Sequence, residues 1–245
     1  MLQDNNGTNG RKLNDDAPNV IRFTPRPAEP PPKKNHPPMV NLPPVTKIML
    51  ALIIGIRIIL FTIGFMNPDL VDTIYTYGGF TPASWSGEIA FRWWTPLTLV
   101  TFSFLHGGWL HLAMNALMLA AFGSGLEKWL GPTRLLQVFV VSSACALLAH
   151  FLFNMHSVGV VIGISGAISG FFGALLIMMR QQNLLGNARN SLMPFIIIWI
   201  ITTIGFGMMG APDGGDIAWV AHLGGFFGGL GFTWWILQPK AFSSR

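Results

Sequence analysis

The stretch ISGAISGFFGALLIMM, from Ile164 to Met179, is an apolar run in which glycine recurs at positions 166, 170 and 173. That spacing places the glycines on one face of a helix, as in membrane helices that pack closely against a neighbour. Its 16 residues would form a helix of about 24 Å, which is shorter than a hydrocarbon layer of about 30 Å. Because Ser165 stands in the first turn, the sequence predicts a recessed polar side chain at one end of a packed membrane helix.

The composition of the whole chain agrees with a membrane environment. Of its 245 residues, 51% are hydrophobic and 10% are charged, and the mean hydropathy is +0.50, whereas soluble domains have about 25% charged residues. The apolar runs lack the alternation of membrane strands, so helices are the expected way to satisfy the backbone in lipid. We therefore expect an all-α polytopic membrane protein with six spanning helices, at Val45–Met66, Pro96–Phe122, Leu135–Phe153, Ile164–Met179, Leu192–Met209 and Ile217–Leu237.

The two ends of the chain differ from this membrane domain, which we place at residues 45–238. Residues 1–44 are rich in Pro, Asn and charge and have little to bury, which predicts a disordered, Pro-rich tail. Residues 239–245 are expected to form a short C-terminal segment. With six spans, Lys and Arg gather on one side of the membrane, so both termini are predicted to be cytoplasmic. The pI of 9.8 follows from this asymmetry and from a basic tail near anionic lipid, without a nucleic-acid partner.

A histidine inside the last apolar stretch could serve as a base for the serine. His222 lies in the sequence AHLGG, residues 221–225, and shares a helical face with Gly225 and Gly229. With six spans, its helix and the helix of Ser165 run in the same direction, so the two side chains can meet near the outer surface if the glycine faces pack together. Polar groups within a membrane are functional candidates, and a serine beside a base is a potential nucleophile.

Two further polar residues belong to the same region. His111 and Asn115 are four residues apart in the second stretch, so they share one helical face. The second stretch also runs inward, so these polar side chains are expected to converge with Ser165 and His222 near the outer leaflet. The third to sixth stretches contain no Asp or Glu, which favours a Ser-His dyad over a triad with a buried carboxylate.

Together these motifs resemble the rhomboid family of intramembrane serine proteases. The similarity extends from about Glu88 to Leu237 and comprises GISG at 163–166, AHLGG at 221–225, the His111/Asn115 pair preceded by His106, Phe91-Arg92, and GLEKWLG at 125–131. One departure is Phe91, because the family usually has tryptophan before this arginine. The resemblance implies a six-helix rhomboid-like bundle and a serine endopeptidase that cleaves transmembrane segments of other membrane proteins near the outer face.

The resemblance also implies specific roles. Ser165 would be the nucleophile and His222 the general base and then the acid, while His111, Asn115 and the backbone N–H of Ser165 would bind the oxyanion. No cofactor or metal is implied, and the sequence has no His-Glu-x-x-His motif. The partners would be the lipid bilayer and transmembrane protein substrates, with no nucleic acid, and the location would be a bacterial cell (inner) membrane.

Other functions remain open at this stage. An inactive rhomboid-like protein could bind membrane proteins without cutting them. A transporter could use intramembrane histidine and broken helices, but the first three and last three stretches show no internal repeat. A b-type haem protein could use His111 and His222 as axial ligands, but this interpretation leaves Ser165 and Asn115 unexplained.

Two charged residues in or near the apolar stretches have no partner that the sequence identifies. Arg57 lies in the middle of the first stretch, where insertion of an arginine costs about 2.5–3.5 kcal/mol. We expect it to face the other helices or to extend toward the inner surface. Glu127, near the cytoplasmic end of the second stretch, is expected to anchor a loop rather than take part in chemistry.

Overall fold

The computed structural model describes residues 42–184, 192–209 and 218–238. Most of the predicted tail and the C-terminal segment 239–245 lie outside these residues, but Pro44, assigned to the tail, begins the first helix. All regular elements of the described residues are helices, which confirms the expected all-α class. They are α1 (Pro44–Met66), α2 (Pro68–Gly78), α3 (Ala83–Ser86), η1 (Thr95–Leu97), α4 (Thr98–Thr101), η2 (Phe102–Phe104), α5 (Trp109–Met118), η3 (Leu119–Gly123), α6 (Ser124–Leu130), α7 (Pro132–Phe153), α8 (Ser165–Gln181), α9 (Met193–Met209) and α10 (Trp219–Ile236).

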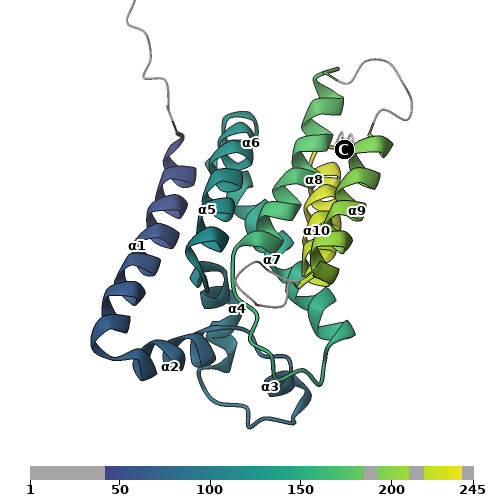
Figure 1. Ribbon diagram of the computed structural model, residues 1–245. Coiled ribbons are helices and arrows are strands. Elements are labelled where there is room, and N and C mark those ends of the chain that lie inside the picture. The colour runs from purple at the N-terminus through teal and green to yellow at the C-terminus, as the bar shows by residue number, and fades with distance from the viewer. Residues whose placement is uncertain (1–41, 185–191, 210–217, 239–245) are drawn as a thin grey trace, which may run out of the picture. The chain divides into compact units, whose positions relative to one another are not determined.

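Within the described ranges, three helices are long and apolar enough to cross a membrane by themselves. They are α1, the continuous helix Trp109–Leu130 formed by α5, η3 and α6, and α7. The other long helices are α8 and α9, with 17 residues each, and α10, with 18. Figure 1 shows α8, α10 and α9 side by side, and α2 crossing the end of α1.

The second expected span, Pro96–Phe122, is wrong in its first half. Residues 95–104 form the short turns η1, α4 and η2, and Leu105 is extended, with φ −88° and ψ 141°. The chain therefore leaves the helical conformation before α5 begins at Trp109. The spanning helix then continues to Leu130 through a π-helical turn at Leu119–Gly123. Hydropathy does not detect the break because residues on both sides of it are apolar.

Glycines bring α10 into direct backbone contact with α8. A Cβ atom built on Gly225 would lie 2.0 Å from the carbonyl oxygen of Gly166, and one on Gly229 would lie 2.2 Å from that of Gly170. Neither position has room for a side chain, so the two backbones touch, as small residues permit in membrane helices. The expectation that these two glycine faces meet is confirmed.

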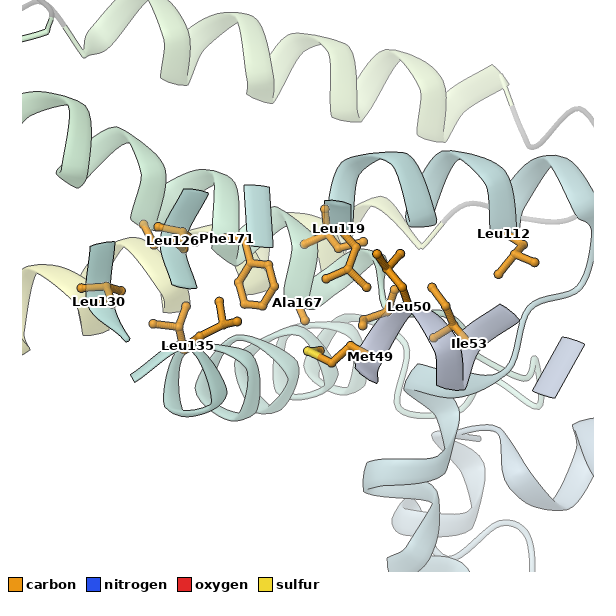
Figure 2. Close-up of a cluster of buried hydrophobic side chains, with 14 residues drawn as sticks. Met49, Leu50, Ile53, Leu112, Leu119, Leu126, Leu130, Leu135, Ala167 and Phe171 are labelled. Atoms are coloured by element: carbon orange, nitrogen blue, oxygen red, sulfur yellow. The ribbon is translucent and has the colours of Figure 1, made fainter. Parts of the chain in front are cut away.

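A buried apolar cluster joins α1, the α5–η3–α6 helix and α7 to α8. Its side chains come from α1, from the continuous helix of α5, η3 and α6, and from α7 and α8, with Phe171 fully buried near its centre (Figure 2). Many large apolar side chains on the outside of these helices remain exposed, among them Ile48 and Phe65 on α1. An exposed apolar surface of this kind suits contact with lipid.

Candidate active site

Ser165 and His222 lie within hydrogen-bonding distance of each other. Ser165 is the first residue of α8, His222 stands in the first turns of α10, and both are half-buried. The Nε2 atom of His222 is 2.8 Å from the Oγ atom of Ser165, although 57 residues separate them in the chain. At this distance the hydroxyl can donate to a neutral imidazole. The two side chains thus meet as expected, and the pair has the geometry of a serine with an adjacent base.

The loop before α8 determines where Ser165 begins its helix. Phe80 and Val161 exchange two backbone hydrogen bonds of 2.9 and 2.8 Å, and the N–H of Gly163 donates to the carbonyl oxygen of Phe102 at 2.8 Å. Gly163 has φ +108°, a conformation that favours glycine. This turn leads the chain into α8, so the N–H of Ser165 belongs to a first turn whose N–H groups have no acceptor within the helix.

His111 and Asn115, on α5, lie against this turn. A Cβ atom built on Gly163 would be 2.8 Å from Nε2 of His111 and 3.6 Å from Nδ2 of Asn115. Asn115 is buried, and its Nδ2 has no hydrogen-bond partner among the residues that the structure describes. Leaving a buried donor unsatisfied costs about 1–3 kcal/mol, and such a donor suits a site that receives its acceptor from a substrate. The four predicted site residues therefore converge from α5, α8 and α10.

His106 precedes the His111/Asn115 pair in the sequence motif, and in the structure its ring contacts His111 rather than Ser165. Its buried ring packs edge-on against the His111 ring, with the ring centroids 5.1 Å apart. Burial, and to a smaller degree the nearby His111 and Arg57 charges, lowers the pKa of His106 to about 4. The His106 ring is therefore neutral at physiological pH.

Ser169, one helical turn after the proposed nucleophile, has a different environment. Its hydroxyl donates to the carbonyl oxygen of Ser165 at 2.9 Å, an arrangement that serines commonly adopt inside membrane helices. It therefore provides a matched comparison for Ser165 on the same helix.

Arg57 and Glu127, for which the sequence identified no partner, both make hydrogen bonds in the structure. Arg57 faces other helices, as expected: its Nη1 donates to the hydroxyl of Tyr75 at 3.0 Å, and its guanidinium carbon lies 5.2 Å from the Trp109 ring centroid. No local sequence signal pointed to Tyr75 or Trp109.

Glu127 is buried at the start of α1, and its carboxylate acts as a helix cap. It accepts hydrogen bonds from the backbone N–H groups of Val45 and Thr46 and from the hydroxyl of Thr46, at 2.9, 2.7 and 2.8 Å. Pro43, the residue just before α1, provides no side-chain cap for this helix. The expectation that Glu127 anchors a loop is wrong, because the segment that it holds is the start of α1.

All four site residues lie within a region that matches a known domain. The family model of the Rhomboid domain matches residues 90–239, more than half of the chain. The chain belongs to the rhomboid family. Its resemblance to that family, inferred from the sequence motifs, is thereby confirmed, as is the expectation of a helical membrane protein.

Several rhomboid relatives have about one third of their aligned residues in common with this chain. It is 32% identical to YdcA of Bacillus subtilis over 149 residues, which cover 61% of this chain and 70% of YdcA. It is 32% identical to RHOMBOID-like protein 5 of Arabidopsis thaliana over 145 residues, covering 58% of this chain and 45% of the relative. It is 33% identical to rhomboid protease GluP of B. subtilis over 153 residues, covering 61% of this chain and 27% of GluP. The chain thus spans less than half the length of the last two relatives. The domain match begins at residue 90, so α1 and α2 lie outside it.

Proposed function

We propose that this rhomboid protein is an intramembrane serine endopeptidase that cleaves transmembrane segments of other membrane proteins near the outer face. The observation that carries the proposal is the 2.8 Å distance between His222 Nε2 and Ser165 Oγ. The unpaired donor of Asn115 beside the same turn supports it, because acyl transfer needs a donor where negative charge develops.

In the proposed reaction, Ser165 Oγ attacks the carbonyl carbon of the scissile bond, and its proton moves to His222 Nε2. The oxyanion accepts hydrogen bonds from His111, Asn115 and the backbone N–H of Ser165. The carbon–nitrogen bond then breaks as His222 gives its proton to the leaving amine. Water, deprotonated by His222, attacks the resulting ester, and Ser165 recovers its proton when the acid product leaves.

We further propose that six helices span the membrane, with both termini on the cytoplasmic side of a bacterial inner membrane. Helices α8 to α10 have 17 or 18 residues, which corresponds to about 25–27 Å, slightly less than a hydrocarbon layer. The distribution of Lys and Arg supports this orientation. A short α8 would leave Ser165 below the outer surface, where it could meet an unwound segment of a substrate helix and water from above.

The main alternative is a rhomboid-like protein that binds membrane proteins without cutting them. The proximity of a serine and a histidine disfavours this alternative, because binding alone does not need that pair. A transporter is a weaker alternative, and no described feature favours it.

Cleavage in proteoliposomes tests the proposal, with a transmembrane substrate that carries helix-breaking residues near its outer end. Ser165→Ala and His222→Ala should each abolish cleavage, and the double variant should be no less active than either one, because the two act as a unit. Ser169→Ala is the matched control and should retain the wild-type rate. Full activity of folded Ser165→Ala would refute the assigned mechanism, whereas wild-type protein that binds the substrate without cutting it would favour the binding alternative.

A further inference from the structure

Arg57 is the one charged side chain of α1 beyond its first turn. In the middle of a membrane helix, such a charge costs about 2.5–3.5 kcal/mol, so its contacts must offset that cost. Its Nη1 donates to the Tyr75 hydroxyl at 3.0 Å, and its guanidinium lies over the face of Trp109 at 5.2 Å. The first contact reaches α2, and the second reaches the first residue of α5.

Tyr75 extends this contact to the backbone just before α5. Its hydroxyl donates to the carbonyl oxygen of His106 at 2.5 Å while accepting from Arg57. A hydrogen bond from a charged donor strengthens the bond that the hydroxyl itself donates. Arg57 therefore holds both ends of the segment 106–109, one end through Tyr75 and the other directly through Trp109.

The chain re-enters the helical conformation in this segment, and no side chain of the segment caps the start of α5. Gly108, the residue that precedes α5, provides no side-chain cap. The conformation at the start of α5 thus depends on contacts from other elements, and those with Arg57 and Tyr75 are directed at its two ends.

The same segment determines where His111 lies. His111 is two residues after Trp109, and the His106 ring packs on it with centroids 5.1 Å apart. The Nε2 atom of His111 is beside Gly163, in the turn that leads to Ser165. A displacement of segment 106–109 would therefore move His111 relative to Ser165.

We propose that Arg57 and Tyr75 are positioning residues that hold the start of α5, so that His111 and Asn115 face the site where the oxyanion forms. This inference rests on the proposed function. Both residues lie outside the region 90–239 that matches the Rhomboid domain, so the device belongs to α1 and α2 of this chain. Neither residue contacts Ser165 or His222, and both act through α5.

The inference is tested with Arg57→Met and Tyr75→Phe in proteoliposomes. Active sites are counted from the endpoint of fluorophosphonate labelling, and kcat is expressed per labelled site. Both variants should lower this kcat roughly 10- to 100-fold, because a small misplacement of catalytic groups is costly. KM should be unchanged, because oxyanion donors act on the transition state. Lys47→Met is the matched control, since it removes an exposed charge from the other end of the same helix, and it should behave as wild type.

A double-variant comparison shows whether the effect passes through His111. In a His111→Ala background, adding Arg57→Met should lower kcat by a several-fold smaller factor than in the wild-type background, with the remaining loss passing through Asn115. An undiminished effect in that background would overturn the inference. So would a fall in the labelled fraction with wild-type kcat per labelled site, because that result indicates a purely structural role. Wild-type protein that neither cleaves nor labels would instead remove the proposed function, and the inference with it.

Discussion

Replacing Gly225 with alanine should separate α10 from α8 and thereby disrupt the Ser165–His222 pair. A Cβ atom at position 225 would lie 2.0 Å from the carbonyl oxygen of Gly166 and 2.7 Å from its carbonyl carbon. Ordinary contacts of a Cβ atom begin at 3.4 Å, so the two backbones must separate by about 1.4 Å (3.4 − 2.0). The obstructing atoms belong to a backbone and cannot rotate aside as a flexible side chain can.

His222 is one turn before Gly225 and should move with it. The distance of 2.8 Å between Nε2 and Oγ would lengthen to about 4 Å, which is too long for a hydrogen bond. Misplacing catalytic groups by about 1 Å can cost about 100-fold in rate, and overpacking typically costs about 1–3 kcal/mol of stability. We therefore expect kcat to fall roughly 100-fold in a protein that still folds.

The assay measures kcat on a transmembrane substrate in proteoliposomes, with thermal unfolding of the purified protein measured in parallel. Gly231→Ala is the matched control, because it lies on the same helix and a Cβ atom there would meet nothing within 4 Å. That variant should have the wild-type rate and stability. If Gly225→Ala also matched wild type in both measurements, close backbone contact would not be what brings the serine and histidine together.

Three other predictions concern the remaining site and the helix cap. A fluorophosphonate should label Ser165, and labelling should weaken as pH falls, because the base must be a neutral imidazole; undiminished labelling of His222→Ala would contradict this role. Asn115→Ala should lower kcat roughly 100- to 1,000-fold in steady-state assays, and an effect confined to KM would count against an oxyanion donor. Glu127→Ala should lower the free energy of unfolding by about 1–3 kcal/mol, because Thr46 and its backbone N–H lose their acceptor. An unchanged denaturation midpoint would argue against the capping role of Glu127.

The sequence alone determined the class of protein and much of the candidate site. Hydropathy is a sum over neighbouring residues, so it located α1, α7 and α8 to within a few residues of their observed ends. The meeting of Ser165 and His222 was also predictable, because helix direction follows from the order of spans and the glycine faces follow from spacing within each helix. The order of spans and the spacing of glycines can both be read directly from the sequence.

The break between η2 and α5 was not predictable in this way. Residues 96–122 contain no Asp, Glu, Lys or Arg, and their hydropathy is the same whether they form one helix or several turns. The N–H of Gly163, a residue far along the chain, donates a hydrogen bond to the carbonyl oxygen of Phe102, the first residue of η2. The point where α5 begins is therefore a tertiary property, and with it the depth of His111.

The partners of the buried charges were likewise decided only by the tertiary structure. That Arg57 and Glu127 need compensating contacts follows from the cost of burying a charge, which is evident from the sequence. Which groups provide the contacts depends on how α1 packs against α2, α5 and α6. Arg57 pairs with Tyr75, 18 residues away, and Glu127 accepts from Thr46, 81 residues away. A single residue specifies the requirement for a partner, whereas only the packing of separate helices specifies its identity.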